Sequence, residues 1–242
     1  MKIAICDDEI LVARQLEKIV RTAWEKGNAG QRSGELTIGL YTSGTALLEE
    51  IEKYDTVFLD LRMPEMDGIE VGKRIREKNP ACRIIVATGE VNRFKEGYVI
   101  GALRFVTKPF EEEEIAEALE EAAQACLGEG VVEAYFANKP YKLLQKEICY
   151  ILSYDGYVRL YTKDREYRKD VGLEKLREDL EQRLFAQIDR GVIVNLAFVE
   201  KEEPAAFVVA GQRFKTARRR REDAKKAYID FKLKYKRKML WG

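Results

Sequence analysis

The chain has 242 residues, of which 46% are hydrophobic and 35% charged, enough for one large folded domain or two small ones. No run approaches the roughly 18 consecutive apolar residues of a membrane span, and residues 1–5 read as a strand rather than a signal peptide. These features predict a cytoplasmic protein with no membrane insertion. The lack of histidine and of Cys-x-x-Cys pairs argues against zinc, and the four scattered cysteines are typical of reduced core thiols.

The first half alternates short apolar runs with amphipathic helical patterns. Strands are predicted over 2–6, 36–41, 56–60, 83–87 and 103–106. Helices are predicted around 10–24, 45–53, 69–78, 89–101 and 111–126. Strict alternation of strand and helix predicts an α/β domain built on a flavodoxin-like, doubly wound, five-stranded parallel sheet.

The stretch Leu127-Gly128-Glu129-Gly130 breaks the last of these helices. It predicts a first domain over 1–127, a linker over 128–130 and a second domain over 131–242. Beyond it, runs rich in Tyr, Val and Ile predict strands over 131–138, 141–144, 147–153, 157–161 and 165–169. A helix over 173–183 follows, then strands over 192–195, 206–210 and 212–216, and a last helix with an apolar stripe. The second domain is therefore predicted to be mostly antiparallel β with a C-terminal helix.

That C-terminal helix lies in a strongly basic segment. Residues 210–242 contain thirteen lysines and arginines against three acidic residues, whereas the whole chain has a net charge of +1. The rest of the chain is therefore acidic, and the basic end predicts an anionic partner. A solvated basic helix without a partner is the alternative.

Polar side chains gather where the predicted parallel strands end. Asp7 and Asp8 follow the first strand, Asp60 ends the third, Thr88 ends the fourth and Lys108 follows the fifth. Because parallel strands share one carboxyl edge, three carboxylates should crowd together there and favour a bound Mg²⁺. A carboxylate beside the metal can attack phosphorus and form an aspartyl phosphate, with the lysine neutralising charge on the phosphoryl oxygens.

Each of these residues also has a simpler explanation. The two adjacent aspartates could cap the helix that begins near residue 10, and the other three could be ordinary polar strand ends or surface groups. The coincidence of all five at one edge favours the phosphoacceptor site.

The segments "ICDDE", "VFLDLRMPEMDG", "IIVATGE" and "ALRFVTKPF" resemble a response-regulator receiver domain over residues 1 to about 127. The resemblance implies phosphorylation of Asp60 by a partner sensor histidine kinase, with Asp7 and Asp8 holding magnesium. It implies a cis bond between Lys108 and Pro109. It also implies that Thr88 and Phe105 form a switch pair; a plain core ring is the simpler explanation of Phe105, and the two roles are compatible.

Two charged residues flank the expected phosphorylation site. Arg62 lies two residues after Asp60, and Glu90 lies two after Thr88. An ion pair between them would shield the acyl phosphate from water and slow its hydrolysis. Two unrelated surface charges are the alternative, and such a pair is worth little energetically.

The second half resembles the LytTR-type DNA-binding domain over about 131–221. The resemblance rests on "ICYILSYDGYVRLYT", "VGLEKLREDLEQRLFAQIDRGVIVNLAFVE" and "RFKTARRRR". It implies loops that enter successive major grooves, where arginine contacts to guanine are the commonest specific ones. Asp189 replaces a histidine that is usual in this family, which puts the usual contact pattern in doubt. An aspartate would repel phosphate unless it accepts a hydrogen bond from cytosine or pairs with Arg190.

Other residues of this domain are candidates for DNA contacts. Arg218 and Arg219 fall at the family's DNA-contacting position after the last strand, and Tyr154 and Tyr157 flank a loop that approaches DNA. Sheet packing is an equally good explanation of the tyrosines, and Asn195 is expected to support a turn. The tail over 231–242 could follow the phosphate backbone or pack on the domain.

Together these features predict a DNA-binding response regulator that dimerises on phosphorylation and controls transcription. Its partners would be a sensor histidine kinase and double-stranded DNA. It would be a phosphoacceptor rather than an enzyme, with at most slow autodephosphorylation. One alternative is an interaction module whose second domain binds protein or RNA. Another is a metal-dependent phosphatase, for which the second domain offers no pocket motif.

Overall fold

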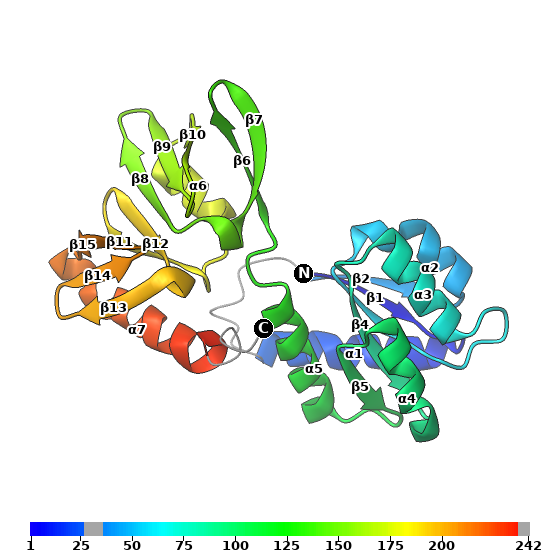
Figure 1. Ribbon diagram of the computed structural model, residues 1–242. Coiled ribbons are helices and arrows are strands. Elements are labelled where there is room, and N and C mark those ends of the chain that lie inside the picture. Colours follow the sequence, from blue (N-terminus) through cyan, green and yellow to red (C-terminus); the bar gives the residue numbers. More distant parts are fainter. Residues whose placement is uncertain (27–35, 237–242) are drawn as a thin grey trace. The chain divides into compact units, whose positions relative to one another are not determined.

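The computed structural model describes residues 1–26 and 36–236 of the chain. The chain divides into two compact units, residues 1–126 and 127–242 (Figure 1). The residues 237–242 of the basic tail lie outside the described part. Among the described helices, none combines the length and the apolar composition that crossing a bilayer demands.

A five-stranded parallel sheet forms the centre of the first unit. Its strand order is β2-β1-β3-β4-β5, the flavodoxin-like order. In this order β2 lies on one side of β1, and β3, β4 and β5 follow on the other side. The strands are β1 (Lys2–Cys6), β2 (Thr37–Tyr41), β3 (Thr56–Leu59), β4 (Arg83–Thr88) and β5 (Arg104–Thr107). The predicted sheet is confirmed.

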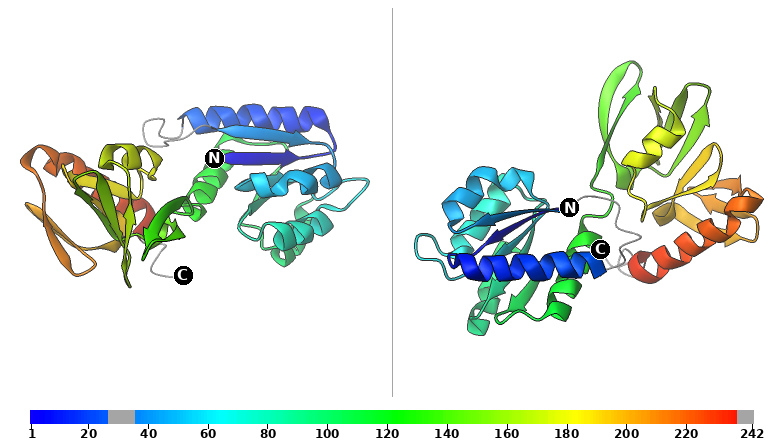
Figure 2. Two further views of the ribbon diagram at one scale, coloured as in Figure 1. Left: turned by 90° about the horizontal axis from the view of Figure 1, so that it is seen from above. Right: turned by 180° about the vertical axis from the view of Figure 1, so that it is seen from behind.

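Helices cover both faces of this sheet (Figure 2). They are α1 (Ile10–Lys26), α2 (Gly44–Glu50), α3 (Gly68–Lys78), α4 (Phe94–Gly97) and α5 (Glu112–Ala125). Alternate residues of each strand point to opposite faces, so Ile3 and Ile5 pack under α1 and α5, whereas Ala4 and Cys6 pack under α2 and α3. The near-continuous apolar strands reflect this double burial.

The predicted helix over 89–101 is not continuous. It consists of a 3₁₀ turn (Val91–Arg93), the single turn of α4 and a second 3₁₀ turn (Tyr98–Ile100) that ends at Gly101 in the left-handed region, with φ of 59°. Gly89, Gly97 and Gly101 lower the helix propensity of this segment, which explains the short pieces. The other four helices of the first unit agree closely with prediction.

Antiparallel strands form the second unit. A seven-stranded sheet has the order β11-β12-β8-β9-β10-β6-β7, and a separate three-stranded sheet has the order β13-β14-β15. Their bounds are β6 (Val131–Phe136), β7 (Lys139–Leu144), β8 (Tyr150–Tyr154), β9 (Tyr157–Tyr161), β10 (Glu166–Lys169), β11 (Phe185–Asp189), β12 (Val192–Asn195), β13 (Val199–Glu203), β14 (Ala206–Val209) and β15 (Gln212–Lys215).

Two helices complete this unit, α6 (Leu173–Asp179) and α7 (Arg221–Phe231), which continues as a π-helical turn (Lys232–Lys236). The apolar stripe predicted for the last helix is buried in the core, and it comprises Ala224, Tyr228, Phe231 and Tyr235. The predicted mostly antiparallel domain with a basic C-terminal helix is therefore confirmed.

Two strands of the second unit were not predicted, and one helix was predicted too long. Helix α6 ends at Asp179, and β11 begins only six residues later, although Leu176, Leu180 and Leu184 continue a helical spacing. The carboxamide of Gln145 accepts from the amide nitrogen of Glu181 (2.7 Å) and so holds the backbone in a non-helical turn. Strand β13 escaped prediction because its sequence, VEKEE, is highly charged and suits only an exposed sheet edge.

Candidate phosphoacceptor site and nucleic-acid interface

Strand ends place Asp7 and Asp60 side by side at the carboxyl edge of the parallel sheet. The amide nitrogen of Asp7 donates to the carbonyl of Tyr41 (3.0 Å), and that of Asp60 donates to the carbonyl of Cys6 (2.9 Å). Both backbones thus continue the hydrogen-bonding ladder one residue beyond the strands. The side chains of Asp7 and Asp60 are 3% and 6% exposed, so both carboxylates are buried and held by rigid backbone.

Lys108 bridges the two buried carboxylates. Its Nζ lies 2.7 Å from Oδ2 of Asp7 and 2.7 Å from Oδ2 of Asp60. Burial raises the pKa of Asp7, and the Lys108 ammonium offsets this only in part. Burial alone lowers the pKa of Lys108, but its hydrogen bonds to Asp60 and Asp7 outweigh burial and raise it, so the ammonium stays charged. The peptide bond between Lys108 and Pro109 is cis.

Asp8 completes an acidic cluster. One carboxylate oxygen from each of Asp7, Asp8 and Asp60 lies within 4.8 Å of the others, and Asp8 is exposed to solvent. Three hard oxygen donors with one side open to solvent fit Mg²⁺, which prefers few carboxylates and keeps several waters. The donor set therefore suits the predicted ion.

The neighbouring strands supply Thr88 and Phe105. Thr88 is 1% exposed, and its Oγ1 accepts from the amide nitrogen of Glu90 (3.2 Å). Its carbonyl accepts from the amide nitrogen of Lys108 (3.2 Å), which ties β4 to the loop after β5. Phe105 pairs with Val86, whereas Thr88 pairs with Thr107, so Phe105 lies farther from the carboxyl edge. The ring of Phe105 is half-buried and lies 6.1 Å from that of Tyr98.

Gly68 allows helix α3 to begin directly against the backbone of Asp60. A Cβ built on Gly68 would lie 2.1 Å from the carbonyl oxygen of Asp60 and 2.6 Å from Cα of Leu61. Asp67 caps α3 through its side chain, which accepts from the amide nitrogen of Ile69 (2.9 Å). The turn within the MPEMDG segment thus fixes the backbone that carries the central carboxylate.

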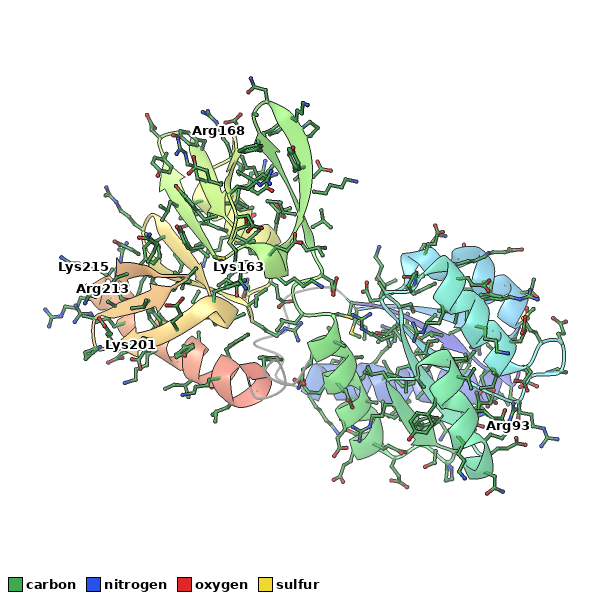
Figure 3. The ribbon with its side chains drawn as sticks, viewed as in Figure 1. Arg93, Lys163, Arg168, Lys201, Arg213 and Lys215 are labelled. Atoms are coloured by element: carbon green, nitrogen blue, oxygen red, sulfur yellow. The ribbon has the colours of Figure 1, made fainter. Side chains whose placement is uncertain are left out.

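Two arginines flank the site. Arg62 lies 3.4 Å from Glu90 by the Nη1 and Oε1 atoms, and its side chain is 81% exposed. Arg93, labelled in Figure 3, links the segment after β4 to the loop between β3 and α3. Its guanidinium donates to the carbonyl of Leu61 (3.3 Å) and to Asp67 (3.0 Å). Sequence reasoning missed Arg93, because its partners lie 32 and 26 residues away and carry no shared motif.

Three loops of the second unit converge around the ends of β8, β11 and β15. The carbonyl of Gly191 accepts from the amide nitrogen of Ser153 (2.8 Å), which joins the β11–β12 turn to β8. The amide nitrogen of Ala217 donates to the carbonyl of Ile188 (3.0 Å), which joins the chain before α7 to β11. Predicted DNA-contacting residues far apart in the sequence therefore lie on neighbouring loops.

Arginines on these loops are available to a partner. Arg190, Arg218 and Arg219 are exposed, and within the described residues none of their guanidinium groups is engaged in an ion pair. Figure 3 shows Lys201, Arg213 and Lys215 projecting from the adjacent three-stranded sheet. Lys201 and Arg213 are ion-paired with Glu203 (3.4 and 2.9 Å), so their charges are partly neutralised within this sheet.

Asp189 does not pair with the side chain of Arg190. Its Oδ1 accepts instead from the amide nitrogen of Arg190 (2.7 Å), so the carboxylate stabilises the backbone of the β11–β12 turn. Asn195, fully buried, donates from Nδ2 to the carbonyl of Ile148 (2.7 Å) and accepts from the amide nitrogen of Ala197 (2.9 Å). The expected structural role of Asn195 agrees with these bonds.

Tyr154 and Tyr157 stack on each other across the β8–β9 turn, with ring centroids 5.1 Å apart and an interplanar angle of 8°. Arg168 lies over Tyr157, with Cζ 4.0 Å from the centroid, and Arg159 lies over Tyr154 at 5.2 Å. The tyrosines thus pack on the sheet surface while Tyr154 stays 41% exposed. Packing and DNA contact are compatible readings of this pair.

Comparison with known proteins agrees with both halves of this description. Residues 3–120 match the response regulator receiver domain, and residues 138–228 match the LytTr DNA-binding domain. The chemotaxis protein CheY of Listeria monocytogenes is 31% identical over 131 residues, 51% of this chain and 99% of that protein. The transcriptional regulatory protein LytR of Staphylococcus aureus is 25% identical over 219 residues, 83% of this chain and 85% of that protein. The sensory transduction protein LytT of Bacillus subtilis is 22% identical over 217 residues, which are 84% of this chain and 86% of that protein.

The fold and the acidic edge define a two-domain signalling protein, with a receiver followed by an antiparallel β domain. The chain belongs to the response-regulator family, in the group whose receiver precedes a LytTr DNA-binding domain.

Proposed function

We propose that the chain is a transcription regulator switched by phosphorylation of Asp60. The observation that carries the proposal is the buried pair Asp7–Asp60 bridged by Lys108 at 2.7 Å, beside the exposed Asp8. The donor is a sensor histidine kinase. An oxygen of Asp60 attacks the phosphorus of the phosphohistidine, a P–O bond forms, the P–N bond breaks, and the imidazole leaves with its electron pair and takes up a proton.

The chain's own residues prepare this transfer. Asp7, Asp8 and Asp60 are the groups that would hold Mg²⁺, which when bound supplies positive charge to the phosphoryl oxygens. Lys108 keeps Asp60 in place and provides a second fixed cation. Thr88 presents a buried hydroxyl at the next strand end, from which it can donate to a phosphoryl oxygen. Beyond slow loss of its own phosphoryl group, we propose no enzymatic turnover.

Phosphorylation acts on the output by shifting a pre-existing equilibrium of the receiver. Reorientation of Thr88 and Phe105 alters the face that carries α5 and β5, the last helix and strand of the receiver, and this face forms a homodimer. Two output domains then engage two half-sites of double-stranded DNA. Arg190, Arg218 and Arg219 contact base edges or phosphates, and Tyr154 and Tyr157 add a rigid aromatic edge. The protein acts in the cytoplasm.

The test is incubation of the full chain with a small phosphodonor and Mg²⁺. We expect an acid-stable, base-labile phosphoryl group on Asp60, located by mass spectrometry, and none after Asp60→Asn. A matched control is Asp55→Asn, an acidic residue outside the cluster. Labelling that persists in Asp60→Asn, or that proceeds equally in EDTA, would contradict the proposal.

A further inference from the structure

Arg93 contacts the backbone next to the phosphoacceptor. Its Nη1 donates to the carbonyl oxygen of Leu61 (3.3 Å), and Leu61 follows Asp60 directly in the chain. The same carbonyl accepts from the amide nitrogen of Gly68 (2.9 Å). Two donors from different segments therefore hold one carbonyl, beside the residue that is proposed to take up the phosphoryl group.

This carbonyl and the amide nitrogen of Arg62 belong to one peptide unit, which is planar and moves as a whole. The Arg62 nitrogen donates to Oδ1 of Asp60 (3.3 Å), and Lys108 holds Oδ2 of the same carboxylate at 2.7 Å. Two donors, one on each oxygen, thus set the rotation of the carboxylate. A cation on the carbonyl also polarises the peptide and strengthens its N–H as a donor. Arg93 therefore acts on Asp60 through a single peptide unit.

Further contacts hold the guanidinium of Arg93 in place. Its Nη2 lies 2.8 Å from Oδ2 of Asp67 and donates to Oε2 of Glu96 (2.7 Å). The Arg93 side chain is 21% exposed, whereas that of Arg62, which joins the same two loops through Glu90, is 81% exposed. Because water screens exposed ion pairs, the Arg93 bridge is the one of the two that can fix backbone geometry.

We infer that Arg93 is a positioning residue for phosphoryl transfer to Asp60. By fixing the peptide unit between Leu61 and Arg62, it keeps the carboxylate of Asp60 oriented for attack on phosphorus. It also joins this unit to Glu96 of α4, so the acceptor loop and α4 share one guanidinium. The role of Arg93 in transfer rests on the proposed function, whereas its hold on the peptide does not.

Transfer is measured on the full chain with acetyl phosphate and saturating Mg²⁺. Arg93→Gln removes both the charge and the bridging geometry, whereas Arg93→Lys keeps the charge but offers one nitrogen in place of a planar fork. We expect both variants to take up the phosphoryl group about fivefold more slowly than the parent, equal to the loss of one ordinary hydrogen bond. The parent rate in Arg93→Lys would mean that the charge alone acts, and it would overturn the positioning role.

The hold on the peptide is measured by NMR on the ¹⁵N-labelled full chain without a phosphodonor. We expect the amide proton of Arg62 to move upfield in Arg93→Gln, because a peptide whose carbonyl loses a charged donor has a weaker N–H donor. If Arg93 only stabilised α4, its removal would shift the resonances of α4 and leave that of Arg62 in place. An unchanged Arg62 amide therefore overturns the inference even if phosphorylation slows.

Two further variants serve as comparisons. Asp67→Asn still caps α3 but loses the ion pair with Arg93, so it should slow transfer by a smaller factor, about twofold. Arg74→Gln removes an equal charge from an exposed residue of α3 and should match the parent in both measurements. Thermal unfolding checks that each variant is folded. Should Arg93→Gln fail to fold, an unchanged rate in Asp67→Asn overturns the inference.

Failure of this inference is distinguishable from failure of the proposed function. If the parent takes up no phosphoryl group on Asp60, the proposed function fails, and the role of Arg93 in transfer fails with it. If the parent is phosphorylated and a folded Arg93→Gln variant keeps the parent rate, only the positioning role of Arg93 is overturned.

Discussion

Lys108 holds together two carboxylates that would otherwise repel each other at the edge of the sheet. Ionised Asp7 has lost most of its water, and the raised pKa of this residue means that its charge costs stability as the pH rises above its ordinary value of 3.8. A cation in the cluster would relieve that cost. The same crowding that makes the site costly to build therefore makes it receptive to Mg²⁺.

Mg²⁺ should stabilise the receiver at neutral pH and lose this effect in acid. At neutral pH, Mg²⁺ at about 100 times its dissociation constant adds roughly 2.7 kcal/mol to the free energy of unfolding. Because burial raises the pKa of Asp7, this carboxyl takes up its proton at a higher pH than an ordinary aspartate as the solution is acidified, and binding weakens. Thermal unfolding with Mg²⁺ or EDTA at both pH values measures the difference, and equal stabilisation at both would contradict the assignment. Asp7→Asn should reduce the effect at neutral pH.

Removal of the Arg62–Glu90 pair should speed hydrolysis of phosphorylated Asp60. The two side chains lie 3.4 Å apart beside the loop that carries the acceptor, so either Ala substitution opens a path for water. The pair is exposed, so we expect at most about a fivefold faster rate, equivalent to about 1 kcal/mol. The measurement is the first-order loss of the phosphoryl group after the donor is removed.

The matched control is Arg74→Ala, which breaks another exposed ion pair, between Arg74 and Glu70 (3.1 Å) on α3. Its hydrolysis rate should equal that of the parent. If Arg62→Ala and Glu90→Ala also leave the rate unchanged, the pair does not shield the phosphoryl group.

The cysteines should differ sharply in reactivity. Burial raises the pKa of the Cys6 and Cys82 thiols to about 12 and also raises that of Cys149, whereas Cys126 is partly exposed. Near neutral pH the three buried thiols carry almost no thiolate and are shielded from reagent. Titration with a chromogenic disulfide should therefore detect one fast thiol in the native protein and four after unfolding. Cys126→Ser should remove the fast thiol, and any fast thiol that remains in this variant would contradict the burial of the other three.

At the scale of elements, the approach of α3 to β3 depends on Gly68. Gly68→Ala would force a Cβ to within 2.1 Å of the Asp60 carbonyl, and backbone atoms cannot yield as side chains do. Overpacking of this kind costs about 1–3 kcal/mol, and the displaced backbone moves Asp60 relative to Asp7. We expect a lower midpoint of denaturation together with slower phosphorylation.

Gly172→Ala provides the comparison. A Cβ at Gly172 meets nothing within 4 Å, and its backbone φ is −70°, which any residue adopts. Its effect on stability should stay within about 0.5 kcal/mol. If Gly68→Ala behaved like Gly172→Ala, the close approach would not matter for the site.

On the scale of the whole molecule, phosphorylation should change which DNA the protein retains. The full chain with a beryllofluoride phosphoryl mimic should enrich specific genomic fragments, because a dimer can engage two half-sites at once. Arg218→Gln should lower the slope of log affinity against log salt by about 1 if this residue contacts phosphate, and relax the sequence preference if it contacts a base. Sequencing of the retained fragments measures both effects.

Asp60→Asn should respond little to the mimic, and it serves as the control for the switch. Uniform, steeply salt-dependent retention of all fragments would contradict sequence-specific binding and favour an interaction module with a basic surface. Enrichment of the same fragments with and without the mimic would show that DNA binding does not depend on the phosphorylation state of the receiver.

The sequence alone determined the alternation of strands and helices, the parallel sheet and the five polar residues at its edge. The physical reason is local: strands that are buried on both faces must be apolar throughout, and an aspartate at such a strand's end has few structural uses. The apolar stripe of α7 was likewise readable, because a helix of period 3.6 displays its buried face in the spacing of its residues.

Only the tertiary structure decided the features that depend on partners far along the chain. Arg93 reaches Leu61 and Asp67, Gln145 holds Glu181, and the charged strand β13 exists because β14 offers it an edge to pair with. The convergence of Arg190 and Arg218 likewise follows from hydrogen bonds between loops rather than from any local pattern. A hydrogen-bond donor or acceptor is satisfied by whatever lies nearby in space, and that neighbour is fixed only when the whole chain has folded.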